Sequence, residues 1–381
     1  MESIRVECDV DAKRPLPVID GAIAGGPLDE VATPVLVVDA PSLERNIDRM
    51  ARLTSGSVRL RPHFKTHKSV AVARRQMAAG AIGITAATVW EAHALAAGGI
   101  ESVLIANEVI GAPKLRRAAQ VARACRLTVA VDSPEGARAL SAAAVEGAAS
   151  IAVVLEIDVG MGRCGVRSVD DALALAALVD RLDSLELHGV MGYEGHCVLE
   201  PDPARRRALA DEAMDVLVHH AERLAEAGHR VDVVSAGGTG TAWMDGLDER
   251  ITDIQAGSYV FMDSAYERVV GDFEVTLSVL ATVLSRHGDT AVLDCGVKTV
   301  ANTLGSPRLL EGGGAVRYVA EEHTVVDLEP RSTLAIGDRV RVVTGHCCET
   351  VNLHDRLVVV RDDIITEIWP TMGRGPGGVW E

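Results

Sequence analysis

Apolar and polar residues follow two alternating patterns along the middle of the chain. Short runs rich in β-branched residues predict buried strands, and the stretches of Ala, Leu, Arg and Glu between them have the period of amphipathic helices. Eight strands are predicted, at Val58–Pro62, Ala81–Ala86, Val103–Ala106, Leu127–Val131, Ile151–Ile157, Leu185–Met191, Val231–Ser235 and Ile251–Ala256. The helices between them include Val70–Ala79, Glu91–Ala97, Pro134–Val145, Val169–Leu182 and Pro203–Ala227. Eight βα repeats predict an α/β fold, a (β/α)8 TIM barrel, for which a doubly wound open sheet is the alternative.

The pattern changes after about residue 266, where the helical period largely disappears. Strand-like runs separated by Gly- and Asp-rich turns follow, at Phe273–Leu284, Thr290–Asp294, Thr324–Leu328, Asp338–Val343, Arg356–Arg361 and Ile364–Trp369. They predict a C-terminal all-β domain. We therefore expect an N-terminal segment at residues 1–32, the barrel at 33–265 and the β domain at 266–381. An extra strand at Val35–Asp39 and its helix at Pro41–Leu53 precede the eight repeats, and they either cover the barrel or join the β domain.

The composition excludes several classes of protein. Asp and Glu (54) outnumber Lys and Arg (38), so the formal net charge is −16, and neither nucleic acid nor an anionic membrane is expected as a partner. The seven cysteines form no disulfide framework, which indicates a reducing compartment. No apolar run reaches the ~18 residues of a membrane span. The first residues also lack the apolar stretch of a signal peptide, so a cytoplasmic protein is expected.

Polar and glycine residues gather after the predicted strands, at the end of the barrel where such folds carry their active sites. Two glycine-rich turns, Gly237-Gly238-Thr239 and Gly257-Ser258, follow the seventh and eighth strands. Turns of this kind present backbone N–H groups to phosphate, and barrels usually bind phosphate at this position. The alternative is that both are ordinary tight turns.

Lys65 follows the first strand and stands among Arg61, His63, His67 and Lys68. Neighbouring cations disfavour the ammonium form of a lysine, so Lys65 is a candidate amine nucleophile that forms a Schiff base. The alternative is a basic patch that binds an anion. Together with a phosphate cradle at the same end of the barrel, the amine points to pyridoxal 5'-phosphate, whose aldehyde bonds to a lysine.

Arg163 lies in the turn after the fifth strand, within Gly160-x-Gly162-x-x-Gly165. This spacing matches a dinucleotide-binding fingerprint, but such a turn belongs to the first βα unit and opens a helix at once. Here four βα units precede the turn, and the next helix is predicted only from Val169. We therefore expect Arg163 to face an anionic oxygen of a cofactor or substrate.

A candidate metal site lies in the β domain, at Gly345-His346-Cys347-Cys348-Glu349-Thr350. His346 and Cys348 are two residues apart and would share one face of an extended segment. Imidazole and thiolate favour zinc over magnesium or manganese. Two ligands fit an open site completed by water or substrate, and Glu322-His323 could join it. The alternative is a buried cysteine pair beside a capping histidine.

These motifs resemble those of a known family. In this order, D-serine dehydratases and D-threonine aldolases carry Arg-Pro-His-x-Lys-Thr-His-Lys, Glu-Ile-Asp-x-Gly-x-x-Arg-x-Gly, Ser-x-Gly-Gly-Thr-x-Thr, Gly-Ser-Tyr-x-Phe-Met-Asp and Gly-His-x-Cys-x-Thr, which here begin at Arg61, Glu156, Ser235, Gly257 and Gly345. These are alanine-racemase-like pyridoxal phosphate enzymes that carry a divalent metal. The resemblance covers the chain from about residue 33 to its end. It implies a barrel that bears the cofactor, a β domain that bears the metal, and a homodimer.

The resemblance also implies roles for individual residues. Lys65 would be the Schiff-base lysine, Arg163 would contact the ring oxygen of the cofactor, and Tyr193 would lie beside its ring. His346 and Cys348 would bind the metal. Residues of the two glycine-rich turns would hold the phosphate, namely Gly238, Thr239, Gly257 and Ser258, with Tyr259 close by. His196 is a candidate acid or base, or alternatively a hydrogen-bond partner of the catalytic groups.

Two reactions of this family have to be distinguished. Dehydratase members typically have His-x-Cys with zinc and a Gly-His after the tyrosine, as at Gly195-His196. Aldolase members resemble the flanks of the motif, but they typically have Asp where Cys348 stands, with manganese or magnesium, and His where Leu199 stands. We therefore expect a lyase that converts D-serine, D-threonine or D-3-hydroxyaspartate to a 2-oxo acid and ammonia. Retro-aldol cleavage to glycine and an aldehyde is the alternative, and an amino acid racemase or a non-catalytic pyridoxal phosphate-binding protein is less favoured.

Overall fold

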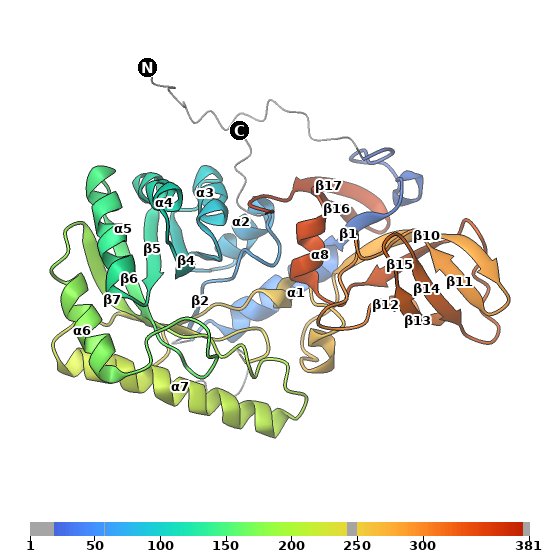
Figure 1. Ribbon diagram of the computed structural model, residues 1–381. Coiled ribbons are helices and arrows are strands. Elements are labelled where there is room, and N and C mark those ends of the chain that lie inside the picture. Colours follow the sequence, from blue (N-terminus) through green and yellow to red (C-terminus); the bar gives the residue numbers. More distant parts are fainter. Residues whose placement is uncertain (1–18, 57, 242–249, 376–381) are drawn as a thin grey trace, which may run out of the picture.

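The computed structural model describes residues 19–56, 58–241 and 250–375, which form a barrel and a strand-rich domain (Figure 1). Eight parallel strands form the barrel sheet in the order β2-β9-β8-β7-β6-β5-β4-β3. Their bounds are β2 Arg59–Leu60, β3 Ile84–Ala86, β4 Ser102–Glu108, β5 Arg126–Val131, β6 Ile151–Glu156, β7 Leu185–Met191, β8 Val233–Ala236 and β9 Asp253–Ile254. A parallel bridge between His63 and Thr85 joins the two end strands, and Phe64 N–H donates to the Thr85 carbonyl at 2.8 Å. The sheet therefore closes, which confirms the barrel and rules out the open sheet.

Helices surround the barrel strands. Their bounds are α1 Ala40–Leu53, α2 Val70–Ala78, α3 Val89–Ala97, α4 Ala112–Ala124, α5 Pro134–Glu146, α6 Val169–Val179 and α7 Pro203–Glu226. The side chains of Thr88, Ser133, Ser168 and Asp202 each accept a backbone N–H in the first turn of α3, α5, α6 and α7, as good N-cap residues do. β9 is followed by the short 3-10 turn η2 (Ser258–Val260), and α1 packs there.

The second domain is a nine-stranded sheet whose main order is β13-β14-β11-β10-β1-β16-β17, with β15 pairing with β10 and β12. Its strands are β1 Val35–Asp39, β10 Leu277–His287, β11 Thr290–Leu293, β12 Arg308–Leu309, β13 Gly314–Val319, β14 Thr324–Leu328, β15 Arg339–Val343, β16 Arg356–Arg361 and β17 Ile364–Pro370. β12 and β13 were not predicted, because β12 has two residues and β13 is largely exposed and lacks an apolar face.

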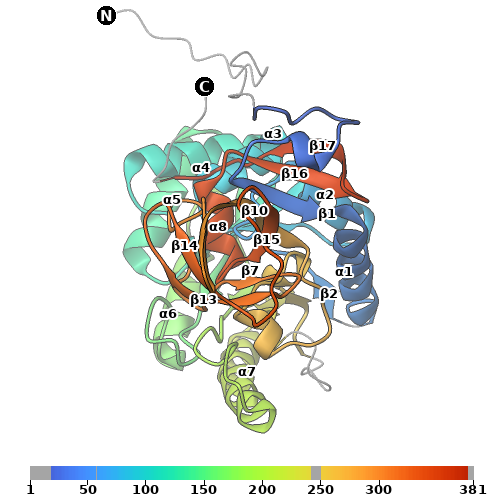
Figure 2. The ribbon, with the colours of Figure 1, turned by 90° about the vertical axis from the view of Figure 1, so that its right-hand side faces the viewer.

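The extra N-terminal strand and its helix lie in different domains. β1 pairs antiparallel with β10 and parallel with β16, so it belongs to the β domain. α1 then packs against η2 at the end of the barrel, and Asn46 and the backbone of Glu274, just before β10, exchange hydrogen bonds of 2.8 and 2.9 Å. As Figures 1 and 2 show, the chain crosses between the domains twice, once between β1 and α1 and once between η2 and β10. Helix α8 (Cys347–Leu353) of the β domain lies next to the barrel.

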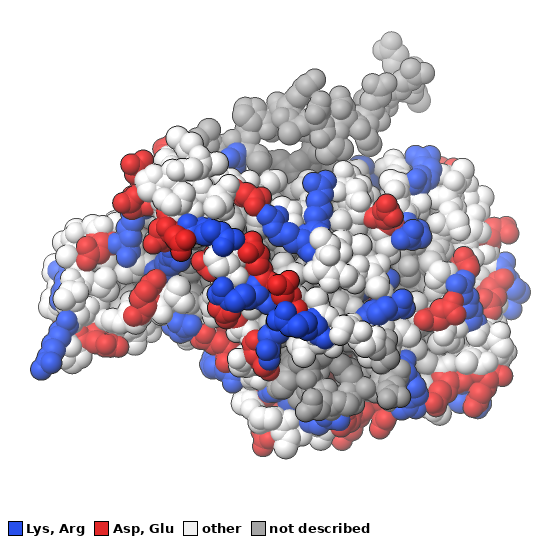
Figure 3. All heavy atoms as spheres, turned by 180° about the vertical axis from the view of Figure 1, so that it is seen from behind, with Lys and Arg blue, Asp and Glu red and all other residues white. Residues whose placement is uncertain are grey.

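The surface is mixed in charge. On the face shown in Figure 3, Lys and Arg side chains are interspersed with Asp and Glu, and no continuous basic area covers it. Among the described helices, none has the length and apolar character needed to cross a bilayer. The first residues, on which the prediction about a signal peptide rests, lie outside the described part of the chain.

Candidate active site

Lys65 lies on the loop that follows β2, at the end of the barrel that faces the β domain. The loop forms a tight turn, closed by backbone hydrogen bonds from His67 and Lys68 N–H to the Phe64 carbonyl, at 3.1 and 2.8 Å. Within this turn, Lys65 Nζ lies 5.4 Å from the centre of the Tyr193 ring, which follows β7. The structure therefore brings together the predicted nucleophile and the predicted ring neighbour.

The residues around Lys65 do not form a basic patch, which was the alternative to a nucleophilic lysine. Burial, with the nearby Lys65 charge adding to it, holds the pKa of His63 well below its usual range, and burial lowers the pKa of His67 to about 3. Both imidazoles are therefore neutral at pH 7. Lys68 Nζ donates to Glu91 Oε1 at 2.6 Å, and Arg61 donates to Ser102 Oγ at 3.1 Å. Among the described residues, no hydrogen bond or ion pair engages the amine of Lys65.

Tyr193 is held between the barrel mouth and a glycine turn. A β-carbon at Gly195 would lie only 2.4 Å from Tyr193 Cε1, so any larger residue there would clash with the ring. Glu194, which lies between Tyr193 and Gly195 in the sequence, is fully buried. Its carboxylate accepts the N–H groups of Gly237 and Gly238 at 3.3 and 3.1 Å, and the Thr241 hydroxyl. The Gly238 N–H is thus engaged by Glu194, and Gly238 packs beneath the Tyr193 ring.

Three other residues of the predicted phosphate cradle keep free donors. Within the described residues, the backbone N–H groups of Thr239, Gly257 and Ser258 make no hydrogen bond. A β-carbon at Gly257 would lie 2.5 Å from Thr66 Oγ1, so only glycine lets this turn approach the Lys65 loop so closely. Unpaired N–H groups on adjoining turns are suited to binding an anion.

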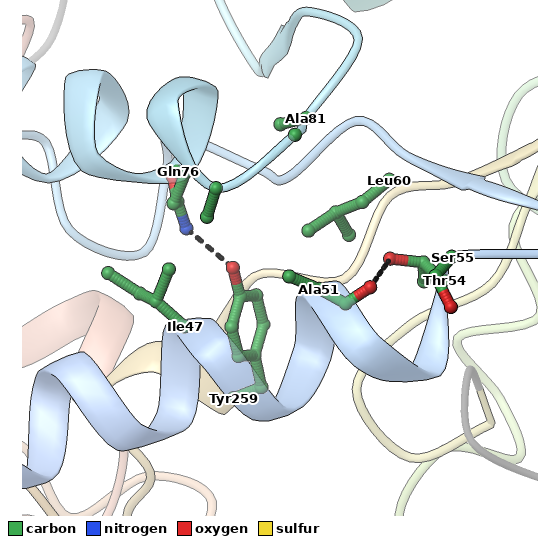
Figure 4. A pocket seen from close by; sticks show the side chains of 10 residues that line it. Ile47, Ala51, Thr54, Ser55, Leu60, Gln76, Ala81 and Tyr259 are labelled. Carbon is green, nitrogen blue, oxygen red and sulfur yellow. Dashed lines mark hydrogen bonds between the residues drawn. The ribbon is translucent and has the colours of Figure 1, made fainter.

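Tyr259 does not face this cradle with its side chain. Its backbone N–H donates to Thr239 Oγ1 at 3.0 Å, but its hydroxyl accepts a hydrogen bond of 2.9 Å from Gln76 on α2. Figure 4 shows the ring between α1 and α2, with its hydroxyl toward Gln76, where it lines a cavity of about 170 Å³. Only the backbone of Tyr259 thus adjoins the predicted cradle, and its closeness to a phosphate stays a prediction.

Arg163 is exposed on the loop after β6, and no described residue forms an ion pair or hydrogen bond with its guanidinium. Glu156, at the end of β6, is one of the groups on which the charge of Arg163 acts. Burial and the neighbouring carboxylate of Glu108 raise the pKa of Glu156 to about 8. Glu156 is therefore largely protonated at pH 7, and the positive charge of Arg163 stays available to an anionic group.

His346, Cys347 and Cys348 bring ring nitrogen and sulfur atoms within 4.8 Å of one another. Contrary to expectation, the segment is not extended. His346 is the residue before α8, and both cysteines lie in the first turn of that helix, where Thr350 N–H donates to the His346 carbonyl at 3.2 Å. The Cys348 sulfur points to the barrel, 3.3 Å from Thr66 Oγ1 and 3.9 Å from Ser258 Oγ.

The charges at this cluster suit metal binding. The hydrogen bond from Cys347, with His346 and Lys65 nearby, holds the pKa of Cys348 well below its usual range, which favours the thiolate. Burial lowers the pKa of His346, but the charges of Cys348 and Asp263 outweigh it and raise that pKa to about 10. A metal would therefore have to displace a proton from the imidazole when it binds. A thiolate beside a histidine is a ligand pair that binds soft or borderline divalent metals.

Two other predicted participants lie apart from this cluster. Glu322 pairs with Lys298 at 2.6 Å and His323 is exposed, so neither belongs to the group of candidate ligands. His196 is exposed and its ring lies against the backbone of Gly160. It stands at the rim of the site rather than among the buried groups.

Comparison with known proteins identifies the family. Residues 38–265 match the family described as alanine racemase, N-terminal domain, and residues 276–360 match a putative serine dehydratase domain. A D-threonine aldolase from an Arthrobacter species is 38% identical over 92% of this chain and 95% of its own length. The chain belongs to the alanine-racemase-like family of D-threonine aldolases and D-serine dehydratases.

Solved structures of this family agree with the fold. The crystal structure of D-threonine aldolase from Filomicrobium marinum superposes with a TM-score of 0.90 at 38% identity, covering 93% of this chain and 98% of that one. D-threo-3-hydroxyaspartate dehydratase from a Delftia species superposes with a TM-score of 0.83 at 31% identity, covering 92% and 99%. The family therefore contains both aldolases and dehydratases that span nearly the whole chain.

In this family member, three buried residues that were not predicted hold the site together: Thr66, Glu194 and Asp263. Thr66 and Asp263 lie inside the motifs quoted above, and Glu194 directly follows Tyr193. Their partners are 282, 44 and 83 residues away. The motifs draw attention to these positions, but no local pattern indicates which partner each one meets.

Removing the Glu194 carboxylate is expected to weaken cofactor binding. Glu194→Gln keeps the shape of the side chain but turns an amide NH2 toward N–H donors, which leaves buried groups unpaired at a cost of about 1–3 kcal/mol each. The distorted glycine turn should raise the dissociation constant of pyridoxal phosphate by roughly 10-fold, as about 1.4 kcal/mol would. Fluorescence titration of the cofactor measures this, with Glu212→Gln on the exposed face of α7 as the control. Unchanged affinity in Glu194→Gln would show that the turn does not depend on this carboxylate.

Proposed function

We propose that the protein is a lyase of D-β-hydroxy-α-amino acids that uses pyridoxal 5'-phosphate and a divalent metal, and that it works as a dehydratase. One observation carries the proposal: the candidate nucleophile and the candidate metal ligands meet at one place. Thr66, next to Lys65, lies 3.3 Å from the Cys348 sulfur (Oγ1 to Sγ). Relatives that cover most of the chain are named for D-threonine, 3-hydroxy-D-aspartate and D-serine, which supports the substrate class.

The residues present fit pyridoxal phosphate. Lys65 offers an unengaged amine beside the Tyr193 ring. Thr239, Gly257 and Ser258 offer N–H groups that no described residue engages, and Arg163 offers a guanidinium without a partner among the described residues. These are the three things that the cofactor needs from a protein: a lysine, an anion cradle and a partner for its ring.

The residues also fit a metal, and we propose zinc. His346 and Cys348 supply nitrogen and sulfur, which zinc accepts and which magnesium and manganese bind less well. Two protein ligands leave positions open for water or the substrate hydroxyl. For D-threo-3-hydroxyaspartate dehydratase, a cysteine-to-alanine variant has been solved in a metal-free form, and a histidine two positions earlier is replaced in another structure. The same spacing separates His346 from Cys348.

When bound, the cofactor withdraws electrons from Cα of the amino acid, and the metal acts as a Lewis acid on the β-hydroxyl. The residues of the chain supply the rest. Lys65 Nζ lies over the Tyr193 ring and would accept the Cα proton. Burial raises the pKa of Tyr193, so its phenol stays protonated and can donate a hydrogen bond. His196 is exposed and would exchange protons with solvent.

Retro-aldol cleavage is the second candidate, because a D-threonine aldolase is 38% identical to the chain whereas D-threo-3-hydroxyaspartate dehydratase is 34% identical. Two residues favour the dehydratase all the same. Cys348 supplies a thiolate ligand, and Leu199, which packs against the hydrophobic core, stands where the aldolases typically have a histidine base.

Product analysis distinguishes the two reactions. The protein loaded with pyridoxal phosphate and zinc is incubated with D-serine, D-threonine and D-3-hydroxyaspartate, and with the L-enantiomers as controls. We expect a 2-oxo acid and ammonia in equal amounts from the D-substrates. Glycine and an aldehyde as the main products would establish the aldolase instead. Racemisation without cleavage would refute both.

A further inference from the structure

Asp263 joins the cofactor side of the site to the metal side. It is fully buried in the turn that follows η2. Its Oδ1 accepts the N–H groups of Ala265 and Tyr266 at 3.1 and 2.9 Å. Its Oδ2 accepts His346 Nδ1–H at 3.0 Å and Cys347 N–H at 2.9 Å. One carboxylate thus fixes its own turn and the segment before α8, which lies 83 residues later.

This contact determines which ring nitrogen of His346 carries a proton and which faces away from Asp263. A carboxylate bonded in this way only accepts, so the proton of the hydrogen bond belongs to His346 Nδ1. Nε2 is then the ring nitrogen left for a metal. Cys347 N–H, held by the same oxygen, fixes the first turn of α8, from which Cys348 projects. Both oxygens of Asp263 are already occupied by donors, which distinguishes it from a ligand.

The segment that carries Asp263 also carries part of the cradle, Gly257 and Ser258. Asp263 follows Ser258 by five residues, and Ser258 Oγ lies 3.9 Å from the Cys348 sulfur. Any shift of the metal segment against the cradle would have to break the hydrogen bonds of Asp263. The position of the His346–Cys348 segment relative to the cradle therefore depends on this side chain.

We propose that Asp263 is a positioning residue that orients His346 through Nδ1 and keeps the metal segment in register with the cofactor cradle. The inference rests on the proposed metal site. Carboxylates that orient a metal-binding histidine typically contribute about 10–100-fold to metal affinity. Asp263 would act by this means, without touching metal or substrate.

The test compares zinc affinity and ligand geometry in wild type, Asp263→Asn and Asp263→Ala, each loaded with pyridoxal phosphate. Zinc affinity is measured by competition with a chromophoric chelator, and cobalt(II) is substituted so that its visible and thiolate charge-transfer bands report the geometry. We expect zinc affinity to fall about 10–100-fold in Asp263→Asn, with altered cobalt bands. Asp253→Asn is the matched control, because Asp253 is similarly buried and hydrogen-bonded, to Ser235 on β8.

The outcomes separate this inference from the proposed function. Wild type that binds neither zinc nor cobalt refutes the metal site, and the inference with it. Wild-type affinity and cobalt bands in a folded Asp263→Asn overturn the inference alone. Thermal unfolding establishes folding, and Asp263→Asn carries the test if Asp263→Ala does not fold.

Discussion

Replacing Lys65 with alanine is expected to abolish the visible absorption band of bound pyridoxal phosphate and to lower kcat/KM by about 10³-fold or more. The reason lies in the surroundings of the amine. His63 and His67 are buried and neutral, and Lys68 is paired with Glu91, so none of them can replace Lys65. Absorption spectra of the purified protein and steady-state kinetics with the D-substrates measure the two effects.

Two variants make this result specific. Lys65→Arg keeps the positive charge, but arginine stays protonated and does not form the covalent bond, so it should be as inactive as Lys65→Ala. Lys114→Ala removes an exposed lysine of α4 and should leave both the spectrum and the kinetics unchanged. A visible band that survives in Lys65→Ala would remove Lys65 from its proposed role.

The barrel could be predicted because its strands are buried on both faces. Such strands appear in the sequence as continuous apolar runs, and Ile151–Glu156 is an example with five buried residues out of six. The position of the site followed from the rule that barrels act at the carboxyl ends of their strands. Lys65 and Tyr193, which follow β2 and β7, do lie side by side there.

The electrostatic surroundings could not be predicted in the same way. The sequence around Lys65 does not indicate whether its basic residues are exposed or buried. Only the fold shows that His67 is buried and that Lys68 forms an ion pair with Glu91. The His-x-Cys spacing also fits a strand or a helix start, and Asp263, 83 residues before His346, satisfies the first N–H of α8. Tertiary contacts of this range leave no periodic signal in a sequence.

Replacing Cys348 with alanine is expected to remove the metal and to lower kcat by about 10²-fold or more, because loss of a Lewis acid forfeits several kcal/mol of transition-state stabilisation. Chelator treatment of wild type should have the same effect, and zinc should restore activity better than manganese, since the ligand is a thiolate. Metal analysis and activity titrations with each metal measure this. A chelator-insensitive wild type would contradict the proposed metal chemistry.

Cys348→Asp then tests whether this one ligand also sets the reaction. A carboxylate keeps the negative charge but prefers harder cations, so manganese or magnesium should now support activity better than zinc. If the ligand also directs the chemistry, glycine should rise relative to 2-oxo acid in the products. If the metal preference changes while the products stay the same, the residues around Leu199 and His196 must decide between dehydration and aldol cleavage. In that case the metal would serve both reactions in the same way, and the acid–base residues near the rim, such as His196, would decide which reaction occurs.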